Sequence, residues 1–258
     1  AEGTGFAAAA NKALGTVSGV AHILVCHDDV ALAPDAVRLL LEEAYRSNAG
    51  LTCPKCVLWD APDRLLSVGM GADRLGVTHS LIEPGELDQG QHDAVHEVFV
   101  APSGSVLVRT DLWRALGGFD ASSGEPGEDL DISWRAHLAG ARVVVAPQAT
   151  VRHLEATKNG IRPCAPAERR DERREEHRFR ALWTCYSVVG LVLLAPVAVF
   201  FVVAETIWAL AHHRSRPEVL LPVAALLRSF RGPRQLRAAR RRAQGLRRAN
   251  DLALWKYQ

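Results

Sequence analysis

Unbroken apolar runs alternate with amphipathic segments along residues 1–155. The run HILVC at 22–26 is typical of a strand buried on both faces, and the next segment places the apolar residues between Val37 and Ala44 on one helical stripe. Strands that alternate with helices predict an α/β fold with a mostly parallel sheet flanked by helices. The same pattern predicts further strands at 51–59, 96–109 and 141–153, and helices at 6–14, 110–118 and 127–140.

Two segments fit this alternation less well. Pro54 lies inside the 51–59 run, and because proline cannot donate to a strand ladder it suits an edge strand or a bulge better than a central position. Residues 60–95 are rich in Gly, Pro, Asp and His and show little periodicity, so loops and short strands are expected there.

The pattern changes after residue 160. Residues 161–180 are densely and oppositely charged, which predicts a charged linker helix. Residues 181–204 then hold no charge, and such a run exceeds the roughly 20 residues that a helix needs to cross a bilayer. We therefore expect a transmembrane or membrane-embedded helix over 181–211, as a single span or a re-entrant hairpin. A buried core helix is the alternative.

The basic charge is concentrated near the end of the chain. The net charge is only +2, yet residues 228–248 contain nine Arg and no acid. Residues 212–258 are accordingly expected to form a basic amphipathic juxtamembrane tail that binds anionic lipid headgroups. We predict no nucleic-acid partner, because aromatics are not interleaved with the arginines and no binding fold accompanies them.

The triplet His27-Asp28-Asp29 follows the 22–26 strand at the carboxyl edge where α/β sheets bind ligands. Side chains two residues apart in an extended chain share a face, so His27 and Asp29 should point together while Asp28 points away. Hard cations such as Mg²⁺ or Mn²⁺ bind one or two carboxylates together with phosphate oxygens. The competing interpretation is an Asx turn that leads into the helix at Pro34.

Two later sites carry further chemistry. Glu128 and Asp129 open the helix of 127–140, where acids favour the helix dipole, yet a carboxylate beside a second one also acquires the raised pKa that a general base requires. His153 ends the 141–153 strand and is a structural residue unless it meets Asp29 in space.

Other catalytic patterns are missing or incomplete. Cys53 and Cys56 form a lone C-x-x-C pair without the second pair that a structural zinc site needs. No G-x-G-x-x-G follows a strand, which argues against a Rossmann-type oxidoreductase. Ser103 and Ser105 lack the nucleophile-elbow pattern. An odd number of cysteines and no secretory signal favour a reduced, cytosol-facing location.

Five segments resemble, in order and spacing, the family-2 glycosyltransferases of GT-A fold. They are GFAAAANKAL, ILVCHDDVALAPDAVRLLLEEA, APSGSVLVRTDLWRALGGFD, GEDLDISWRAHLAGARVVVAP and VRH. The resemblance implies a partial, Rossmann-related GT-A domain over residues 1–160. Relatives begin with a nucleotide-binding segment before GFAAAANKAL, so residues 1–258 are expected to be weakly active or inactive alone.

The resemblance also implies a metal site. Asp29 matches the carboxylate that binds a divalent cation, Mg²⁺ or Mn²⁺. His27 stands where many relatives have Asp or Asn, and His153 matches a late histidine that completes the metal shell in some members.

Catalytic and substrate-binding residues follow from the same resemblance. Asp129 matches the base that deprotonates the acceptor hydroxyl, with Glu128 as its neighbour. Asp28, Asn11 and Trp134 match positions beside the substrates.

The implied reaction is an inverting transfer of a sugar from a UDP- or dTDP-sugar to a glycan or lipid-linked acceptor of the cell envelope. The implied location is the plasma membrane, with the catalytic part on the cytoplasmic face and membrane lipids as partners. The alternative is a non-catalytic, membrane-anchored GT-A-like interaction module.

Overall fold

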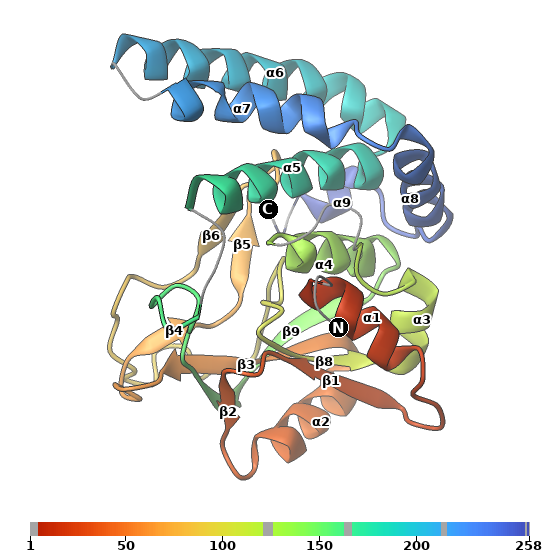
Figure 1. The fold of residues 1–258 in the computed structure, drawn as a ribbon. Coiled ribbons are helices and arrows are strands. Elements are labelled where there is room, and N and C mark those ends of the chain that lie inside the picture. The colour runs from red at the N-terminus through yellow and green to blue at the C-terminus, as the bar shows by residue number, and fades with distance from the viewer. Residues whose placement is uncertain (1–4, 121–125, 163–166, 213–215, 256, 258) are drawn as a thin grey trace.

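A computed structural model describes residues 5–120, 126–162, 167–212, 216–255 and 257 of the 258-residue chain. A mixed sheet lies at one end of the molecule, and successive layers of helices cover it (Figure 1). The strands of this sheet are β1 (His22–Cys26), β2 (Val30–Leu32), β3 (Ala49–Leu58), β4 (Leu65–Ser67), β7 (His96–Glu97), β8 (Ser105–Arg109) and β9 (Arg142–His153). A separate hairpin consists of β5 (Met70–Ala72) and β6 (Thr78–Ser80).

The predicted α/β class is confirmed, but the sheet is mixed rather than mostly parallel. Its central order is β1-β8-β3-β9-β2, and among these neighbours only β3 and β9 pair in parallel. Strands β1, β3 and β9 do run in one direction, as alternation with helices requires. Strand β8 is inserted between β1 and β3 in the opposite direction, and this non-local insertion leaves no mark in the periodicity.

Strand β3 is central, and Pro54 lies at a bulge within it. The register of β3 against β9 shifts between Pro54 and Lys55. The missing N–H of proline therefore coincides with an interruption of the ladder, as the alternative of a bulge predicts. Residues 60–95 contain only short strands among loops, as expected.

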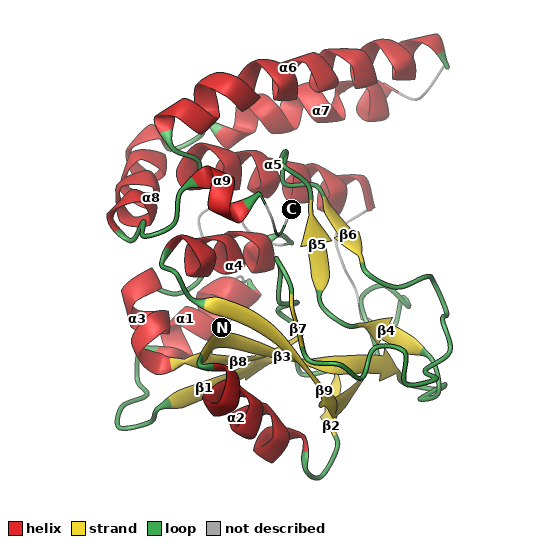
Figure 2. Cartoon of the chain, turned by 180° about the vertical axis from the view of Figure 1, so that it is seen from behind, coloured by secondary structure: helices red, strands yellow, loops and turns green. Residues whose placement is uncertain are grey.

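Helices cover both faces of the sheet (Figure 2). Helix α2 (Ala36–Ser47) packs on one face through Ala36, Leu40 and Ala44, whereas Val37 stays exposed. The opposite face is covered by three helices that enclose the main core with the sheet. These are α1 (Phe6–Leu14), α3 (Thr110–Leu116) and α4 (Glu128–Leu138).

Further helices form outer layers on α4 (Figure 1). The uncharged run that begins at residue 181 is divided between two helices, because its first residues end α5 and the chain turns before α6 starts. Among the described residues, α6 is the one helix long and apolar enough to cross a membrane. The outer elements are α5 (Ala167–Cys185), α6 (Val188–Ala211), α7 (Arg216–Ser229), α8 (Pro233–Gly245) and α9 (Asp251–Leu254).

Part of the arginine-rich segment points into the fold. Arg240 donates to the carbonyl oxygens of Trp183 and, at 2.9 Å, of Tyr186. Arg247 donates to the Cys185 carbonyl. These cations satisfy the orphan carbonyls at the C-terminus of α5 and complement its dipole. The expected lipid-binding role therefore does not extend to every arginine of this segment.

A buried ion pair connects α4 to α3. Arg135 pairs with Asp131 one turn earlier on α4, and both side chains are less than a tenth exposed. Arg135 also donates to the carbonyls of Leu116 (2.8 Å) and Gly118 (2.9 Å), at the end of α3. One guanidinium thus holds the helix that begins with Glu128 and Asp129 against the α3 turn.

We predict that Arg135→Ala lowers the free energy of unfolding by about 3–5 kcal/mol, because it leaves Asp131 buried without its counter-ion. Urea denaturation followed by circular dichroism measures this change. Arg38→Ala is the matched control, since Arg38 and Glu42 form an exposed i,i+4 pair on α2, and we expect it to be nearly neutral. Equal losses in the two variants would contradict the structural role of Arg135.

Candidate active site

A pocket of about 690 Å³ opens between the carboxyl edge of the sheet and helix α5. It is lined by the end of β1, the loop of residues 102–105, the start of α4, the end of β9, the β5–β6 hairpin and one side of α5. His27, Glu128, Asp129 and His153 all reach it. Four of the residues singled out in the sequence therefore face one cavity.

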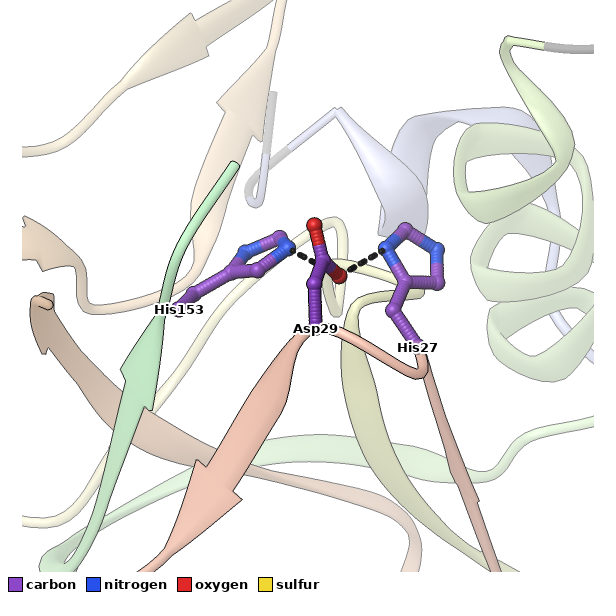
Figure 3. A group of neighbouring side chains, drawn as sticks. All are labelled: His27, Asp29 and His153. Atoms are coloured by element: carbon purple, nitrogen blue, oxygen red, sulfur yellow. Dashed lines mark hydrogen bonds and ion pairs between the residues drawn. The ribbon is translucent and has the colours of Figure 1, made fainter. Parts of the chain in front are cut away.

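Asp29 lies between two imidazoles (Figure 3). Its Oδ1 is 3.2 Å from Nε2 of His153 and 3.9 Å from Nδ1 of His27. One ligand atom from each of the three residues lies within 4.8 Å of the others. The structure thus brings together the three residues predicted to bind the metal.

The local backbone explains this convergence. The amide of His27 donates to the Gly104 carbonyl at 3.0 Å, which fixes the end of β1. Strand β2 pairs with β9 so that Val30 is opposite His153, and this register places Asp29 beside the end of β9. The amide of Ala156 donates to Asp29 Oδ2 at 2.9 Å, and the amide of Leu154 donates to the Asp29 carbonyl at 3.0 Å.

Gly104 provides the space that the histidines occupy. A Cβ atom at this position would lie 3.2 Å from a ring carbon of His153 and 3.8 Å from His27 Nδ1. A side chain at residue 104 would therefore crowd the His153 imidazole and bring His27 into van der Waals contact. The small-residue break APSGS, predicted only as a gap between strand segments, is part of the site.

The protonation states suit a cation site. Burial, followed by the neighbouring His153, lowers the pKa of His27 and so keeps its imidazole neutral. Burial alone raises the pKa of Asp29, but the hydrogen bond from Ala156 and the two histidines outweigh it, and the net shift is downward. Imidazole nitrogens and a carboxylate form a donor set that divalent transition metals such as Mn²⁺ accept.

Asp28 points away from this cluster, as strand-like alternation predicts. Its side chain is largely exposed and pairs with Arg162 at 2.8 Å. Asp28 is therefore positioned apart from the three metal-site residues.

Glu128 and Asp129 begin α4 at the wall of the pocket. Glu128 is buried, and its Oε1 accepts a hydrogen bond from Ser103 Oγ at 2.9 Å. Its Oε2 is buried and finds no hydrogen-bond partner among the residues that the structure describes. Asp129 is half-buried, and its Oδ1 accepts from the amide of Leu130 at 2.8 Å.

Burial and the adjacent Glu128 carboxylate raise the pKa of Asp129 to about 7. The opposing contributions, from the hydrogen bond of Leu130 and from Arg174, are smaller. Asp129 can therefore accept a proton near neutral pH, which is the property of a general base.

Asn11 is not in this pocket. Its side-chain amide donates to the Phe119 carbonyl at 2.9 Å and accepts from the Phe119 amide at 2.9 Å. It thereby ties α1 to the turn after α3, beside a separate cavity of about 330 Å³. In this structure its side chain acts as a structural clamp, and its expected position beside the substrate stays a prediction.

Trp134 is likewise in the core rather than in the pocket. It is 1% exposed and packs edge-on against Phe99 and Tyr186. Its ring lies 3.4 Å from the position that a Cβ on Gly76 would take, and Gly76 lines the pocket. The contact of Trp134 with the pocket is therefore indirect, since residue 134 falls on the inner face of α4.

Sequence reasoning missed the contribution of α5. Arg174, Glu175 and Arg178 line the pocket, and Arg178 donates to the Leu75 carbonyl at 2.9 Å. The charge pattern of 161–180 indicates only a linker helix. No local pattern shows that one side of this helix closes a cavity formed by much earlier residues.

The cysteine pair has an ordinary structural environment. Cys53 and Cys56 are both buried in β3 and free of disulfides. Burial raises the pKa of each thiol, that of Cys56 to about 12, so neither is a ready nucleophile or metal ligand.

Proteins similar to this chain in sequence include a glycosyltransferase. The pre-mycofactocin glycosyltransferase of Mycobacterium tuberculosis (strains CDC 1551 and H37Rv) is 34% identical over 116 residues, which cover 43% of this chain and 24% of that protein. The match therefore spans about a quarter of the length of these relatives.

Two solved structures align with parts of this chain at low sequence identity. The crystal structure of GalNAc-T7 with UDP, GalNAc and Mn²⁺ aligns with a TM-score of 0.48 and 14% identity, over 58% of this chain and 30% of that one. The mannosyltransferase PcManGT from Pyrobaculum calidifontis, in complex with GDP-Man and Mn²⁺, aligns with a TM-score of 0.44 and 16% identity, over 98% of this chain and 67% of that one.

The family model described as glycosyltransferase-like family 2 matches residues 1–173. This range holds the sheet, the three metal-site residues and both acids of α4. The chain belongs to glycosyltransferase family 2, and its mixed sheet with flanking helices is a GT-A-type fold.

Proposed function

We propose that this chain forms the metal and acceptor side of an inverting glycosyltransferase that moves a sugar from a nucleotide-sugar donor to an acceptor hydroxyl. The main support is one pocket that joins His27 and His153 to Asp129, a carboxylate whose pKa is raised to about 7. A proton acceptor and a cation-binding set in one cavity are what displacement of a nucleoside diphosphate requires.

His27, Asp29 and His153 would hold the divalent cation. When bound, the cation supplies positive charge that stabilises the departing diphosphate. The hydrogen bonds from Ala156 and Leu154 hold Asp29 in place, so that the carboxylate needs little rearrangement when it binds the ion. Asp28, exposed and paired with Arg162, is proposed to lie beside the sugar-nucleotide.

Asp129 would take the proton from the acceptor hydroxyl as that oxygen attacks the anomeric carbon. Attack from the side opposite the leaving diphosphate inverts the configuration. Glu128 acts on Asp129 through its charge, and the Ser103 hydroxyl fixes the Glu128 carboxylate. Arg174, which also lines the pocket, is a cation near the same carboxylate.

We propose UDP- or dTDP-sugars as donors and a glycan or lipid-linked acceptor of the cell envelope. The apolar helix α6 supports association with membrane lipids. The catalytic part would then lie on the cytoplasmic face of the plasma membrane, where nucleotide sugars are made. The four sections expected from the sequence remain a proposal for domain organisation: 1–160, 161–180, 181–211 and 212–258.

We predict that Asp29→Asn weakens Mn²⁺ binding by more than about 100-fold, because even the loss of an outer partner of a metal ligand costs about 10- to 100-fold. Isothermal titration with MnCl₂ measures the affinity. Asp28→Asn is the matched control, since Asp28 is adjacent in sequence but points away from the cluster. His27→Ala tests the third ligand in the same assay. Unchanged Mn²⁺ affinity in Asp29→Asn would refute the metal site.

We predict that Asp129→Asn lowers the turnover number of the full-length protein by about 10²–10⁴-fold while donor and Mn²⁺ binding persist. In the unmodified protein, turnover should rise with pH through about 7, as Asp129 loses its proton. Glu128→Gln should move that midpoint to lower pH, because a negative neighbour is removed. Stopped assays with a panel of nucleotide sugars measure both effects.

Glu42→Gln on α2, on the other face of the sheet, serves as the control and should leave the pH profile unchanged. Wild-type function in both Asp29→Asn and Asp129→Asn would instead favour the non-catalytic interaction module.

A further inference from the structure

Most residues of helix α6 are not buried by the rest of the protein. Its buried residues are Gly190, Ala198, Val202 and Ala209, which apart from Gly190 form one narrow stripe. At about 100° per residue, its exposed apolar side chains cover well over half of the helix circumference. They are Val188, Val189, Val192, Leu193, Val197, Val199, Phe200, Phe201, Val203, Ile207, Trp208 and Leu210.

The exposed arc is free of charge. Glu205 is exposed but lies outside this arc, on the side of the helix that interacts with Glu175 and Arg178 of α5. The hydroxyl of Thr206, at the margin of the arc, donates to the Val202 carbonyl at 2.7 Å within the same helix. Such internal satisfaction of polar groups suits a lipid environment. A second copy of the chain would cover one face only, whereas a bilayer can surround the whole arc.

Helix α7 fastens α6 to the catalytic domain. It packs along both α6 and α5, and Arg228 near its end pairs with Glu172 of α5. Trp183 donates to Ser229 Oγ at 2.9 Å, and Arg180 donates to the Ser229 carbonyl at 3.3 Å. The three helices consequently lie side by side, with α6 outermost (Figures 1 and 2).

This stacking determines how α6 can meet a membrane. If α6 crossed the bilayer, the parallel layer of α5, with its charged side chains between residues 169 and 178, would enter the hydrocarbon region. The apolar part of α7, Val219–Ser229, extends only about 16 Å at 1.5 Å per residue, roughly half the hydrocarbon thickness. A return crossing by α7 is therefore too short.

We propose that α6 lies flat in one leaflet, with its exposed arc in the acyl region and α7 and α5 on the water side. The protein is then attached to the membrane surface by a helix in the plane of the bilayer, and it is not fixed by a crossing α6. Because α6 has no polar face of its own, α7, which packs along it, separates it from water. Of the two alternatives left open by the sequence, this placement resembles the re-entrant one but involves no deep insertion.

Arginines at one end of this layer supply charge complementarity. Arg231 and Arg234 are exposed where α7 leads into α8, beside the start of α6. They differ from Arg240 and Arg247, which are engaged with α5 carbonyls. Exposed cations beside the start of α6 are placed to bind anionic lipid headgroups.

The same geometry places the pocket near the membrane. The α6–α7 pair extends past the N-terminal end of α5, on the side of the β5–β6 hairpin (Figures 1 and 2). Glu175 and Arg178 line the pocket and also neighbour Glu205 of α6. If the pocket catalyses the proposed glycosyl transfer, its position close to α6 favours an acceptor that is held by the membrane, with the reacting hydroxyl at the depth of the headgroups.

The depth of α6 can be measured directly. Val189→Cys, Phe200→Cys and Ile207→Cys place an environment-sensitive fluorophore at three exposed positions on the same side of the helix, the first two about 16 Å apart along its axis. The labelled full chain is bound to phosphatidylcholine–phosphatidylglycerol vesicles that carry nitroxides near the headgroup or near the bilayer centre. A flat helix predicts equal quenching at all three sites, stronger from the shallow nitroxide.

A crossing helix predicts instead that the central site at Phe200 is quenched most by the deep nitroxide, which would overturn the proposal. Absence of quenching at all three sites would overturn it too, and would indicate a protein partner or a second copy. Tyr45→Cys, exposed on α2, is the unquenched control. All the labelled variants are made in a chain that also carries Cys26→Ser and Cys164→Ser. Since quenching needs no turnover, its outcome is independent of the proposed chemistry.

We also predict that Arg231→Gln with Arg234→Gln weakens binding to the anionic vesicles about 10- to 30-fold in a flotation assay, and that high salt removes the difference. Arg38→Gln with Arg109→Gln makes the same change in net charge at two exposed ion pairs, and this control should bind as the unmodified chain does. Equal weakening in both variants would show that net charge alone acts, and would refute a membrane-facing role for the α7–α8 arginines.

Discussion

The site depends on the contact between Asp29 and the end of β9. Its carboxylate meets His153 and the Ala156 amide across 124 and 127 residues of sequence. This contact requires that β2 pair with β9 in the observed register, with Val30 opposite His153. A slip by one residue would turn His153 to the other face of the sheet. The His27–Asp29–His153 cluster is therefore a product of the whole sheet, because its members come from segments far apart in the sequence.

Local patterns predicted most helices and strands and the acids of the site, because these features depend on residues that are close together in the sequence. Runs of apolar residues located the strands around HILVC and VVVAP. The alternating direction of side chains in an extended chain predicted that His27 and Asp29 point together. The order of strands could not be predicted, since the insertion of β8 between β1 and β3 is settled by pairing over long distances. The same limit applies to Asn11 and Trp134, whose side chains are directed by tertiary packing.

The arginines show how identical residues acquire different roles. In sequence, the nine arginines between 228 and 248 form one basic segment. In the fold, Arg240 and Arg247 end α5 by satisfying its last carbonyls, whereas Arg231 and Arg234 remain exposed. Composition can indicate an electrostatic surface, but the position of each side chain relative to a helix terminus decides whether its charge stabilises the fold or reaches a partner.

Helix α5 connects the α6–α7 pair to the pocket. On one side it packs against α7, and on the other Arg178 holds the Leu75 carbonyl beside Gly76 at the pocket wall. A Cβ on Gly76 would press on both Arg178 and Trp134, so this turn, α5 and α4 fit together as one packed unit. Because close-packed elements move together rather than deform independently, lipid bound at α6 would fix the orientation of the pocket wall as well as its distance from the bilayer. If α6 binds lipid as proposed, membrane attachment would orient the pocket as well as localise the chain.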